Sequence, residues 1–364
     1  MKRLSLLLLA AVAFAGCDSN EPDDRAGLTL YVGNQGNFAD NNGSLTRYVV
    51  ETGETTPDAV PNLGGLVQNL YGADDELYVL LNFSDSFTTG RGRIDVVDAT
   101  TRARTQQIDV RTPRALSVKT STGAEVTEFY ATNLYAGTAT PVNVVTGTAG
   151  TPVAVGANPE GAVDVGSRTY VANSGFGSGT TLSVLNTDTG ATVETLGDVC
   201  TGPRTLLRDN QDEVWVICTG RTDFATQEVT GGAVVVLDGA DGDEIARFDY
   251  DETIGSASFG RDGVFVPGDD EQEVYVVAQG AILRFDANTN TASGRIEVAG
   301  APIGAVEVDP EAGRIYLGRP NAESPFGADG EVTIHDLSGA EVGRFGAGVA
   351  PSVFAFVREG TPEA

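Results

Sequence analysis

The feature that most constrains the fold is a short strand pattern, an aromatic residue followed by an apolar one, that recurs along the whole chain. Seven copies can be aligned, centred on Tyr31, Tyr78, Tyr130, Tyr170, Trp215, Tyr275 and Tyr316. Successive markers are separated by 47, 52, 40, 45, 60 and 41 residues. Aromatic and β-branched residues favour strands, and this period is typical of a repeated four-stranded blade. We therefore expect an all-β chain of seven blades.

Each blade can be divided into four strands, which we name A to D from the innermost outward. Strand B carries the aromatic marker, strand C follows as in TTLSVLNTDTG from Thr180, and strand D as in ATVETLG from Ala191. A crossing then leads to the next strand A, marked in most repeats by a proline: Pro113, Pro159, Pro203, Pro302 and Pro351. The longest interval is expected to hold an insertion from Asp249 to Asp270.

The two ends of the repeat array predict how the ring closes. The chain enters the first blade at a B strand, and SVFAFV after Pro351 is an A-type strand with no B strand behind it. Completing blade 1 with this last strand would remove the unpaired edges that an open array exposes. We expect a seven-bladed β-propeller over residues 28–358, closed by the C-terminal strand, and a disordered tail over residues 359–364.

The charge balance excludes one class of partner. The chain has 51 acidic and 23 basic residues and a formal charge of −28, whereas nucleic-acid binding depends on cationic side chains. The acidic residues are scattered among turns, which favours a solvated, salt-adapted surface over one that attracts cations. We expect no nucleic-acid partner.

The sequence of the N-terminus indicates an export signal. A basic start at Lys2 and Arg3 precedes an apolar run that is too short to span a bilayer. Phe14-Ala15-Gly16-Cys17 resembles a bacterial lipobox, which implies a signal peptide over residues 1–16, a lipidated Cys17 and a flexible acidic tether over residues 17–27. The alternative is an ordinary secretory signal with an incidental cysteine. The lipobox implies anchoring to the outer membrane, with contact to the membrane only through the lipid. The acidic cluster behind Cys17 resembles the signal that sends Bacteroidetes lipoproteins to the outer surface, which implies exposure there.

The repeats resemble the YVTN-type β-propellers of bacterial and archaeal surface proteins. The residues that carry the resemblance are Tyr170-Val171-Ala172-Asn173 and the run from Asp309 to Gly318, and it covers nearly all of residues 28–358. The first repeat, YVGNQGNFADNNGSLTRYV from Tyr31, looks like propeller lipoproteins of the Bacteroidetes, a group that includes cobalamin-capturing proteins partnered with outer-membrane transporters. The resemblance implies a binding protein and, as partner, a TonB-dependent transporter.

Candidate ligand contacts gather in the loops that join strand B to strand C. These loops share one face of the disc with the D-to-A crossings, and rigid scaffolds carry function on such loops. Six of the seven contain an aromatic residue, which either contacts ligand or covers the neighbouring blade. Together with polar residues at the strand ends, the candidates are Asn34, Phe38, Asn82, Phe83, Phe87, Asn133, Tyr135, Asn173, Phe176, Arg221, Phe224, Arg319 and Phe326. Arg91, and Arg114 and Arg204 after the crossing prolines, add cationic groups nearby.

The sequence offers few residues in the patterns typical of catalytic or metal-binding sites. The single histidine, His335, lies on a C strand at a packing position, so a structural role is favoured. The acidic run Asp238–Glu244 lacks the full spacing of a calcium loop and fits a C–D turn. We expect no cofactor, no metal and no catalysis. The lactonases and quinoprotein dehydrogenases share the expected architecture, but a fold alone does not transfer a function.

Two cysteines remain after Cys17. Cys200 lies just before the fifth A strand and Cys218 at the end of the fifth B strand, so antiparallel pairing would bring them together. An exported protein can keep a disulfide there, and two buried thiols are the alternative.

These observations lead to three functional hypotheses. The first is a lipid-anchored propeller that captures a small organic ligand, such as a cobalamin, for a transporter. The second is a structural or adhesive protein that binds a glycan or another protein. The third is a lactonase-like or quinone-dependent enzyme, which predicts clustered acid and base groups at the central channel; the near-absence of histidine speaks against it.

Overall fold

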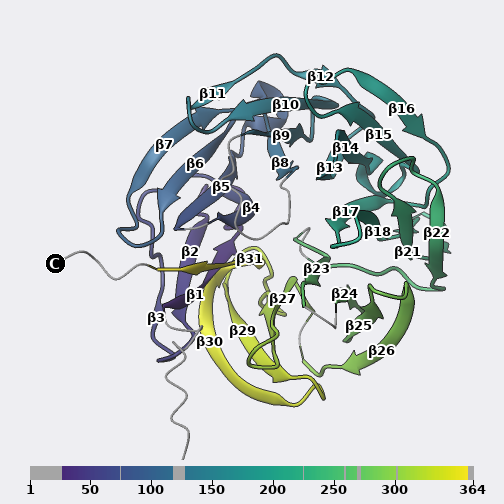
Figure 1. Ribbon diagram of the computed structural model, residues 1–364. Helices are drawn as coiled ribbons and strands as arrows, with labels where there is room; N and C mark the ends of the chain where they lie inside the picture. The colour runs from purple at the N-terminus through teal and green to yellow at the C-terminus, as the bar shows by residue number, and fades with distance from the viewer. Residues whose placement is uncertain are drawn as a thin grey trace, which may run out of the picture.

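The computed structural model describes residues 27–359, except residues 74, 118–127, 224, 258–259, 269–271 and 301. The expected signal peptide, Cys17, nearly all of the expected tether and most of the expected tail therefore lie outside the described residues. The described chain forms seven blades around a central axis (Figure 1). No helix among these residues is long and apolar enough to cross a membrane.

The first four blades follow one pattern from the axis outward. Blade 1 consists of β31 (Pro351–Arg358), β1 (Leu28–Asn34), β2 (Ser44–Val49) and β3 (Thr55–Thr56). Blade 2 consists of β4 (Leu66–Ala73), β5 (Glu76–Asn82), β6 (Gly92–Asp98) and β7 (Arg104–Asp109). Blade 3 consists of β8 (Pro113–Leu116), β9 (Glu128–Asn133), β10 (Thr138–Asn143) and a divided outer strand, β11 (Thr148–Ala149) and β12 (Val153–Ala154). Blade 4 consists of β13 (Pro159–Val165), β14 (Arg168–Asn173), β15 (Thr181–Asn186) and β16 (Thr192–Leu196).

The last three blades repeat the pattern with one addition. Blade 5 consists of β17 (Pro203–Arg208), β18 (Glu213–Cys218), β21 (Ala233–Asp238) and β22 (Glu244–Asp249), with a hairpin of β19 (Arg221–Thr222) and β20 (Val229–Thr230) in its B–C loop. Blade 6 consists of β23 (Gly263–Val266), β24 (Glu273–Ala278), β25 (Ala281–Asp286) and β26 (Thr291–Glu297). Blade 7 consists of β27 (Ala305–Asp309), β28 (Arg314–Arg319), β29 (Asp329–Asp336) and β30 (Glu341–Val349). The short helices are α1 (Ser86–Thr89) and η1 (Gly175–Gly177).

The predicted closure is confirmed. β31 pairs antiparallel with β1, from Leu28 beside Arg358 to Asn34 beside Pro351. Glu359, just past β31, accepts hydrogen bonds from the Tyr31 hydroxyl and the Arg47 guanidinium. The last strand is therefore the inner strand of blade 1, and its pairing covers an edge of β1 that would otherwise be open.

The aromatic markers are scaffolding, as their repetition predicts. All seven are buried, with at most 5% of their surface exposed. Three tyrosines also link successive blades, because each hydroxyl donates to a backbone carbonyl in the C–D turn of the next blade. The pairs are Tyr31 with Ala99 at 2.9 Å, Tyr130 with Thr187 at 3.2 Å and Tyr170 with Gly239 at 3.1 Å. Their recurrence thus reflects a repeated contact between neighbouring blades.

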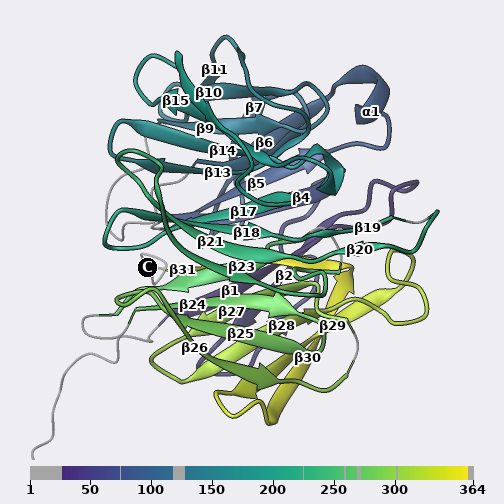
Figure 2. The same cartoon turned by 90° about the vertical axis from the view of Figure 1, so that its right-hand side faces the viewer.

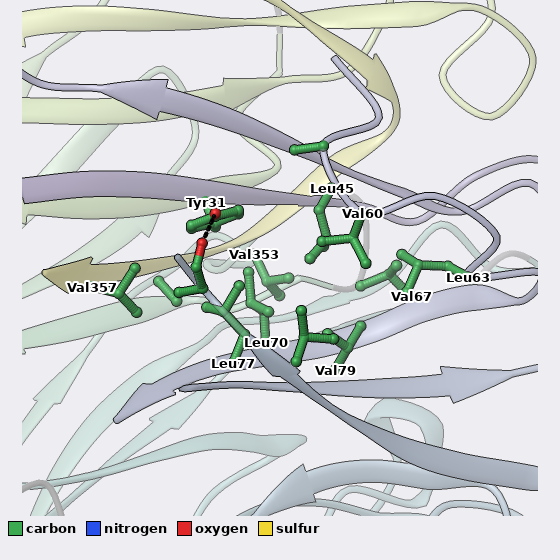
Figure 3. Close-up of a cluster of buried hydrophobic side chains, with 14 of the residues drawn as sticks. Tyr31, Leu45, Val60, Leu63, Val67, Leu70, Leu77, Val79, Val353 and Val357 are labelled. Carbon is green, nitrogen blue, oxygen red and sulfur yellow. Dashed lines mark hydrogen bonds between the residues drawn. The ribbon is translucent and has the colours of Figure 1, made fainter. Parts of the chain in front are cut away.

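Apolar layers fill the spaces between blades. Figure 3 shows the layer between blades 1 and 2, where Tyr31 and Leu45 face Leu70, Leu77 and other residues of the neighbouring sheet. The B strands are buried on both faces, which explains why they read as nearly continuous apolar runs rather than as an alternating pattern.

The interpretation of Asp249–Asp270 as an insertion is wrong in part. This stretch contains β23, the inner strand of blade 6. GVFV is short and no proline precedes it, so the sequence carries no clear sign of a strand there. Extra length also lies in the B–C loop of blade 5, which holds the β19–β20 hairpin.

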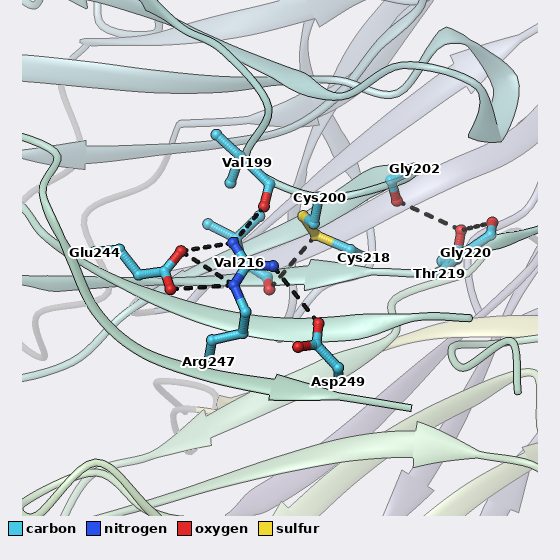
Figure 4. Close-up of a disulfide and its surroundings, with 10 residues drawn as sticks. All are labelled: Val199, Cys200, Gly202, Val216, Cys218, Thr219, Gly220, Glu244, Arg247 and Asp249. Carbon is cyan, nitrogen blue, oxygen red and sulfur yellow. Dashed lines mark hydrogen bonds and ion pairs between the residues drawn. A yellow bond between two sulfur atoms is a disulfide. The ribbon is translucent and has the colours of Figure 1, made fainter. Parts of the chain in front are cut away.

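The predicted disulfide is confirmed. Cys200, before β17, is bonded to Cys218, at the end of β18, with their Cα atoms 6.0 Å apart (Figure 4). Arg247 on the outer strand β22 donates to the Val199 carbonyl at 2.7 Å, which also holds the crossing segment. The disulfide is consistent with export to an oxidising compartment.

Candidate functional site

One face of the disc carries the B–C loops, and in Figure 2 it is the side that bears α1 and the β19–β20 hairpin. The register places the starts of the inner strands at the same edge. Pro113 pairs with Asn133, Pro159 with Asn173 and Pro203 with Cys218, so each of these A strands begins where its B strand ends.

An exposed group of three rings lies on this face. It is formed by Phe87 from blade 2, Tyr135 from blade 3 and Phe176 from blade 4, which we call the aromatic platform. Phe87 and Tyr135 meet edge to face with centroids 5.4 Å apart, and Tyr135 and Phe176 are 6.1 Å apart. Their exposures are 72%, 41% and 59% respectively, far from those of core residues. The structure thus brings together three of the predicted candidates.

The loop that carries Phe176 is tightly built. The Gly177 N–H donates to Ser174 Oγ at 3.2 Å, the Gly179 N–H donates to the Ser174 carbonyl at 2.7 Å, and Ser178 Oγ donates to the Gly175 carbonyl at 2.6 Å. Phe176 has φ 54° and ψ 44°, in the left-handed region. A side chain is disfavoured there, by about 1–2 kcal/mol for a non-glycine residue. An exposed ring is therefore held in a strained conformation.

The loop that carries Phe87 is also ordered by its own contacts. Ser86 Oγ accepts from the Phe83 N–H at 2.7 Å and donates to the Arg91 carbonyl at 2.5 Å. Phe83 is half-buried beneath the guanidinium groups of Arg91 and Arg93, at 4.6 and 5.3 Å from its ring centroid. Phe83 therefore supports the loop, while Phe87 points out from it.

The other loop candidates are spread around the face. Phe38 in blade 1 and Phe326 in blade 7 are exposed, and the side chain of Asn37 donates to the Phe326 carbonyl at 2.9 Å and so joins the two loops. Arg221 is half exposed beside Asp223 at 3.6 Å. Phe224 lies outside the described residues.

The polar candidates at the strand ends are buried within the blades. Asn34 donates to Ser44 and Thr46, and Asn173 donates to Thr181 and Ser183. Two others also bond strand C, since Asn133 accepts from Thr138 and Thr140 and Arg319 donates to Thr333. Asn82 is buried, with 4% of its surface exposed. The side chains of Asn34, Asn133, Asn173 and Arg319 therefore bond strand B to strand C.

A second group of residues surrounds a cavity of about 230 Å³ on the axis, lined by the inner strands of blades 2 to 6. Arg114, Glu160 and Arg204 each directly follow the proline that begins an A strand, so they form a charged ring at the B–C loop edge. Further along the strands the wall is apolar, with Leu116 and Phe265 among its residues. Sequence reasoning placed Arg114 and Arg204 near the loop face but missed Glu160, although the Pro-Arg and Pro-Glu pairs repeat.

The charged groups of the cavity are tied to one another across blades. Arg114 Nε donates to Glu160 at 2.9 Å and its Nη1 donates to Gln68 at 3.2 Å. Arg204 Nε donates to the fully buried Asp262 at 2.7 Å. Burial opposes the ionisation of Asp262, but Arg204 and the Ser256 N–H hold its pKa below the usual value.

Arg261, just before β23, reaches across the axis. Its Nη2 donates to the Leu70 carbonyl of blade 2 at 2.8 Å, and the guanidinium lies 5.2 Å from the ring centroid of Tyr71. On its other side Arg261 is 3.9 Å from Glu307 of blade 7. Burial raises the pKa of Glu307 to about 7, an effect that Arg261 and the Val308 N–H only partly offset. Sequence reasoning missed Arg261, Asp262 and Glu307; a carboxylate within the apolar strand AVEVD was the available signal.

The remaining polar features have structural partners. His335 is buried between the Gly339 carbonyl at 3.0 Å and Thr333 Oγ1 at 2.9 Å, as a packed residue would be. Asp238–Glu244 forms a turn in which Asp238 accepts from the Ala240 N–H at 2.7 Å. Across the described ranges no group of three or more His, Cys, Asp or Glu residues could hold a metal ion.

Comparison with known proteins identifies the architecture. No protein-family model and no curated protein sequence matches the chain. Its fold, a seven-bladed propeller, is similar to that of several solved structures. The periplasmic gluconolactonase of Pseudomonas aeruginosa is 15% identical with a TM-score of 0.65, over 91% of this chain and 99% of that one. A Bacteroides fragilis protein provisionally named a 6-phosphogluconolactonase is 16% identical with a TM-score of 0.63, over 93% and 100%.

The same architecture occurs with other functions. Hydrazine synthase of Kuenenia stuttgartiensis is 16% identical with a TM-score of 0.62, over 83% of this chain and 91% of that one. Identities this low establish the fold and leave the chemistry to be argued from this chain's own residues.

Proposed function

We propose that this protein is an exported binding protein that captures an organic ligand on its B–C loop face, with the aromatic platform as the principal contact. The observation that carries the proposal is Phe176, an exposed ring held in the left-handed region by a loop bonded to itself. Backbone strain of this kind concentrates at functional sites, where the surrounding structure maintains it.

The platform suits a ligand with a broad planar or apolar surface. Aromatic side chains contribute large contact areas and lose little conformational freedom on binding. Rings from three blades on a rigid scaffold are already in position, so binding orders few groups. A corrin or related tetrapyrrole has such a surface, and its delivery to a TonB-dependent transporter from a lipid anchor at Cys17 belongs to the same proposal. Mass spectrometry of the N-terminal peptide should then find an acylated Cys17.

Equilibrium dialysis against cobalamins and related tetrapyrroles tests the proposal. Phe176→Ala should weaken binding roughly tenfold or more, since buried aromatic anchors dominate such interfaces. Phe38→Ala is the matched control, because Phe38 has the same 59% exposure on the same face but lies on blade 1. Absence of binding at micromolar tetrapyrrole would exclude that ligand class. Equal losses for the two variants would exclude the platform, and recovery of only a glycan or protein from surface extracts would favour an adhesive function.

A lactonase-type enzyme is the second candidate function. The specific observation in its favour is the central cavity, which is lined by Glu160 and three arginines. One of these, Arg261, lies next to Glu307 outside the lining, and burial raises the pKa of Glu307 to about 7. A carboxyl group with such a pKa can exchange protons near neutral pH. Hydrolysis of glucono-δ-lactone above the spontaneous rate, lost in Glu160→Gln, would support this function, and turnover equal to the buffer rate would exclude it for that substrate.

A further inference from the structure

The central cavity has a local charge balance opposite to that of the whole chain. The protein carries a formal charge of −28, yet the wall of the cavity contains three arginines and a single carboxylate, Glu160. Asp262 and Glu307 are not among the residues that line the cavity, and their side chains are 0% and 10% exposed. The three arginines line the cavity, and the side chains of Arg114, Arg204 and Arg261 are 8%, 11% and 19% exposed.

Arg204 is fixed in place while one edge of its guanidinium remains open. Asp262 accepts from Nε and Nη2, and the Ser256 carbonyl and hydroxyl accept from Nη2 at 3.1 and 3.0 Å. No described residue accepts a hydrogen bond from its Nη1. Asp262 and Ser256 together engage both hydrogens of Nη2, so the open edge of Arg204 consists of Nη1 alone, whose fixed N–H groups can donate to a carboxylate.

The charges of the site sum to at most one positive charge. Arg114, Arg204 and Arg261 contribute three, and Glu160 and Asp262 remove two. Glu307 removes the third only when it is ionised, and burial places its pKa at about 7. A single negative charge on a ligand would balance this site, whereas a dianion would leave an uncompensated charge in a desolvated place.

The ionisation of Glu307 changes the net charge of the site, and Arg261 is the charged residue that interacts with Glu307. The charged residues of the strands around it are engaged elsewhere. On β28, Arg314 donates to backbone carbonyls and Arg319 donates to Thr333 of β29. Glu273 on β24 accepts from Arg284, and Arg358 at the end of β31 is exposed.

The opposite end of the cavity is apolar. Leu116, Val163, Leu207 and Phe265 follow the charged ring along their strands, so the wall changes from charged to hydrocarbon with depth. The volume of about 230 Å³ is below the range of sites for drug-sized ligands. From the open arginine edge, the single excess charge and the apolar depth, we propose that the central cavity binds a small monocarboxylate with an aliphatic or aromatic body.

The carboxylate contacts the open edge of Arg204 at the charged ring, and the hydrocarbon body lies against the apolar wall. This site is separate from the aromatic platform and does not require catalysis. Titration calorimetry of the full chain with hexanoate at pH 6 tests it, with acetate, gluconate and hexanamide as comparison ligands. Hexanoate should bind most tightly, gluconate and acetate more weakly, and uncharged hexanamide at least about tenfold more weakly than hexanoate.

Two variants test the two ends of the cavity. Arg204→Lys keeps a cation for Asp262 but loses the open edge, and it should weaken hexanoate binding roughly tenfold. Val264→Phe fills the apolar end from a partly exposed position, and it should abolish hexanoate binding while acetate binding persists. Arg344→Lys, at an exposed ion pair with Glu331, is the control and should bind as the unmodified protein does.

The pH dependence of hexanoate binding is an independent test of the proposed site. Hexanoate affinity should fall between pH 6 and pH 8 as Glu307 ionises and neutralises the excess charge, and Glu307→Gln should remove that fall. No heat from hexanoate at millimolar concentration, or equal affinity for hexanoate and hexanamide, would overturn the proposal. Failure of tetrapyrrole binding or of lactone hydrolysis leaves these measurements unaffected, so the proposals are judged separately.

Discussion

Replacement of Phe176 distinguishes two roles for its ring, contact with a ligand and coverage of the core. The two roles predict different losses in the free energy of unfolding. The ring is 59% exposed, so less than half of its surface is buried against the loop and Tyr135. Complete burial of a large apolar side chain contributes about 1.5–3 kcal/mol. Phe176→Ala should therefore reduce the free energy of unfolding by only about 1 kcal/mol.

Phe176→Gly should cost less than Phe176→Ala, although glycine normally destabilises a folded chain relative to alanine. The backbone at Phe176 has φ 54°, where glycine is unstrained. Relief of about 1 kcal/mol of strain should offset the lost ring contacts, so Phe176→Gly should be close to the unmodified protein in stability. Phe38 does not share the positive φ, so there glycine should be less stable than alanine by about 0.4–1 kcal/mol.

Urea unfolding followed by far-UV circular dichroism measures these differences, with equal slopes required across the variants. The informative quantity is the Gly-minus-Ala difference at each position, which should have opposite signs at Phe176 and Phe38. A loss of more than about 3 kcal/mol in either Phe176 variant would match truncation of a core aromatic and would refute the reasoning.

Three further changes should alter stability by amounts set by the contacts described above. Reduction of the Cys200–Cys218 disulfide, or Cys200→Ser with Cys218→Ser, should lower the free energy of unfolding by about 3 kcal/mol because the unfolded chain regains loop entropy; unchanged urea midpoints with and without reductant would contradict this. Tyr170→Phe removes the hydrogen bond to the next blade and leaves a buried carbonyl unpaired, so it should cost about 1–3 kcal/mol by the same assay. Burial raises the pKa of Glu307 from 4.5 to about 7, so the folded state binds the proton more tightly and stability should fall as pH rises from 4.5 to 7. Glu307→Gln should remove up to about 3 kcal/mol of that fall, and identical pH profiles for the two proteins would count against it.

The fold was predictable because its determinants are local and repeated. Alternation of strand and turn residues within 40 to 60 positions defines each blade, and seven repetitions reinforce one interpretation. The same local logic predicted the disulfide, since consecutive A and B strands are antiparallel neighbours. Where the repeat is degenerate the prediction failed, as at β23, whose four residues GVFV are not preceded by a crossing proline.

The asparagines at the ends of strand B illustrate a second limit. Their position beside the loops makes them look like ligand contacts, but Asn34 and Asn173 point back into the blade and bond strand C. The side chain of a residue at the end of a strand can bond its own sheet or extend into the loops, and a single sequence does not reveal which it does. The Ser and Thr residues two positions apart on strand C, such as Thr181 and Ser183, were the available sign of a structural partnership.

The central cavity could not be assembled from sequence for a different reason. Its contacts join residues far apart in the chain: Arg114 and Glu160 are separated by 46 positions, Arg204 and Asp262 by 58, and Arg261 and Leu70 by 191. Each arginine alone resembles many surface arginines of this chain, which mostly pair with nearby carboxylates. Only ring closure places them around one axis, and the excess positive charge depends on Glu307, whose burial raises its pKa to about 7. A charged residue directly after a crossing proline is therefore informative once the blade count is known, because closure turns equivalent positions of successive repeats into neighbours.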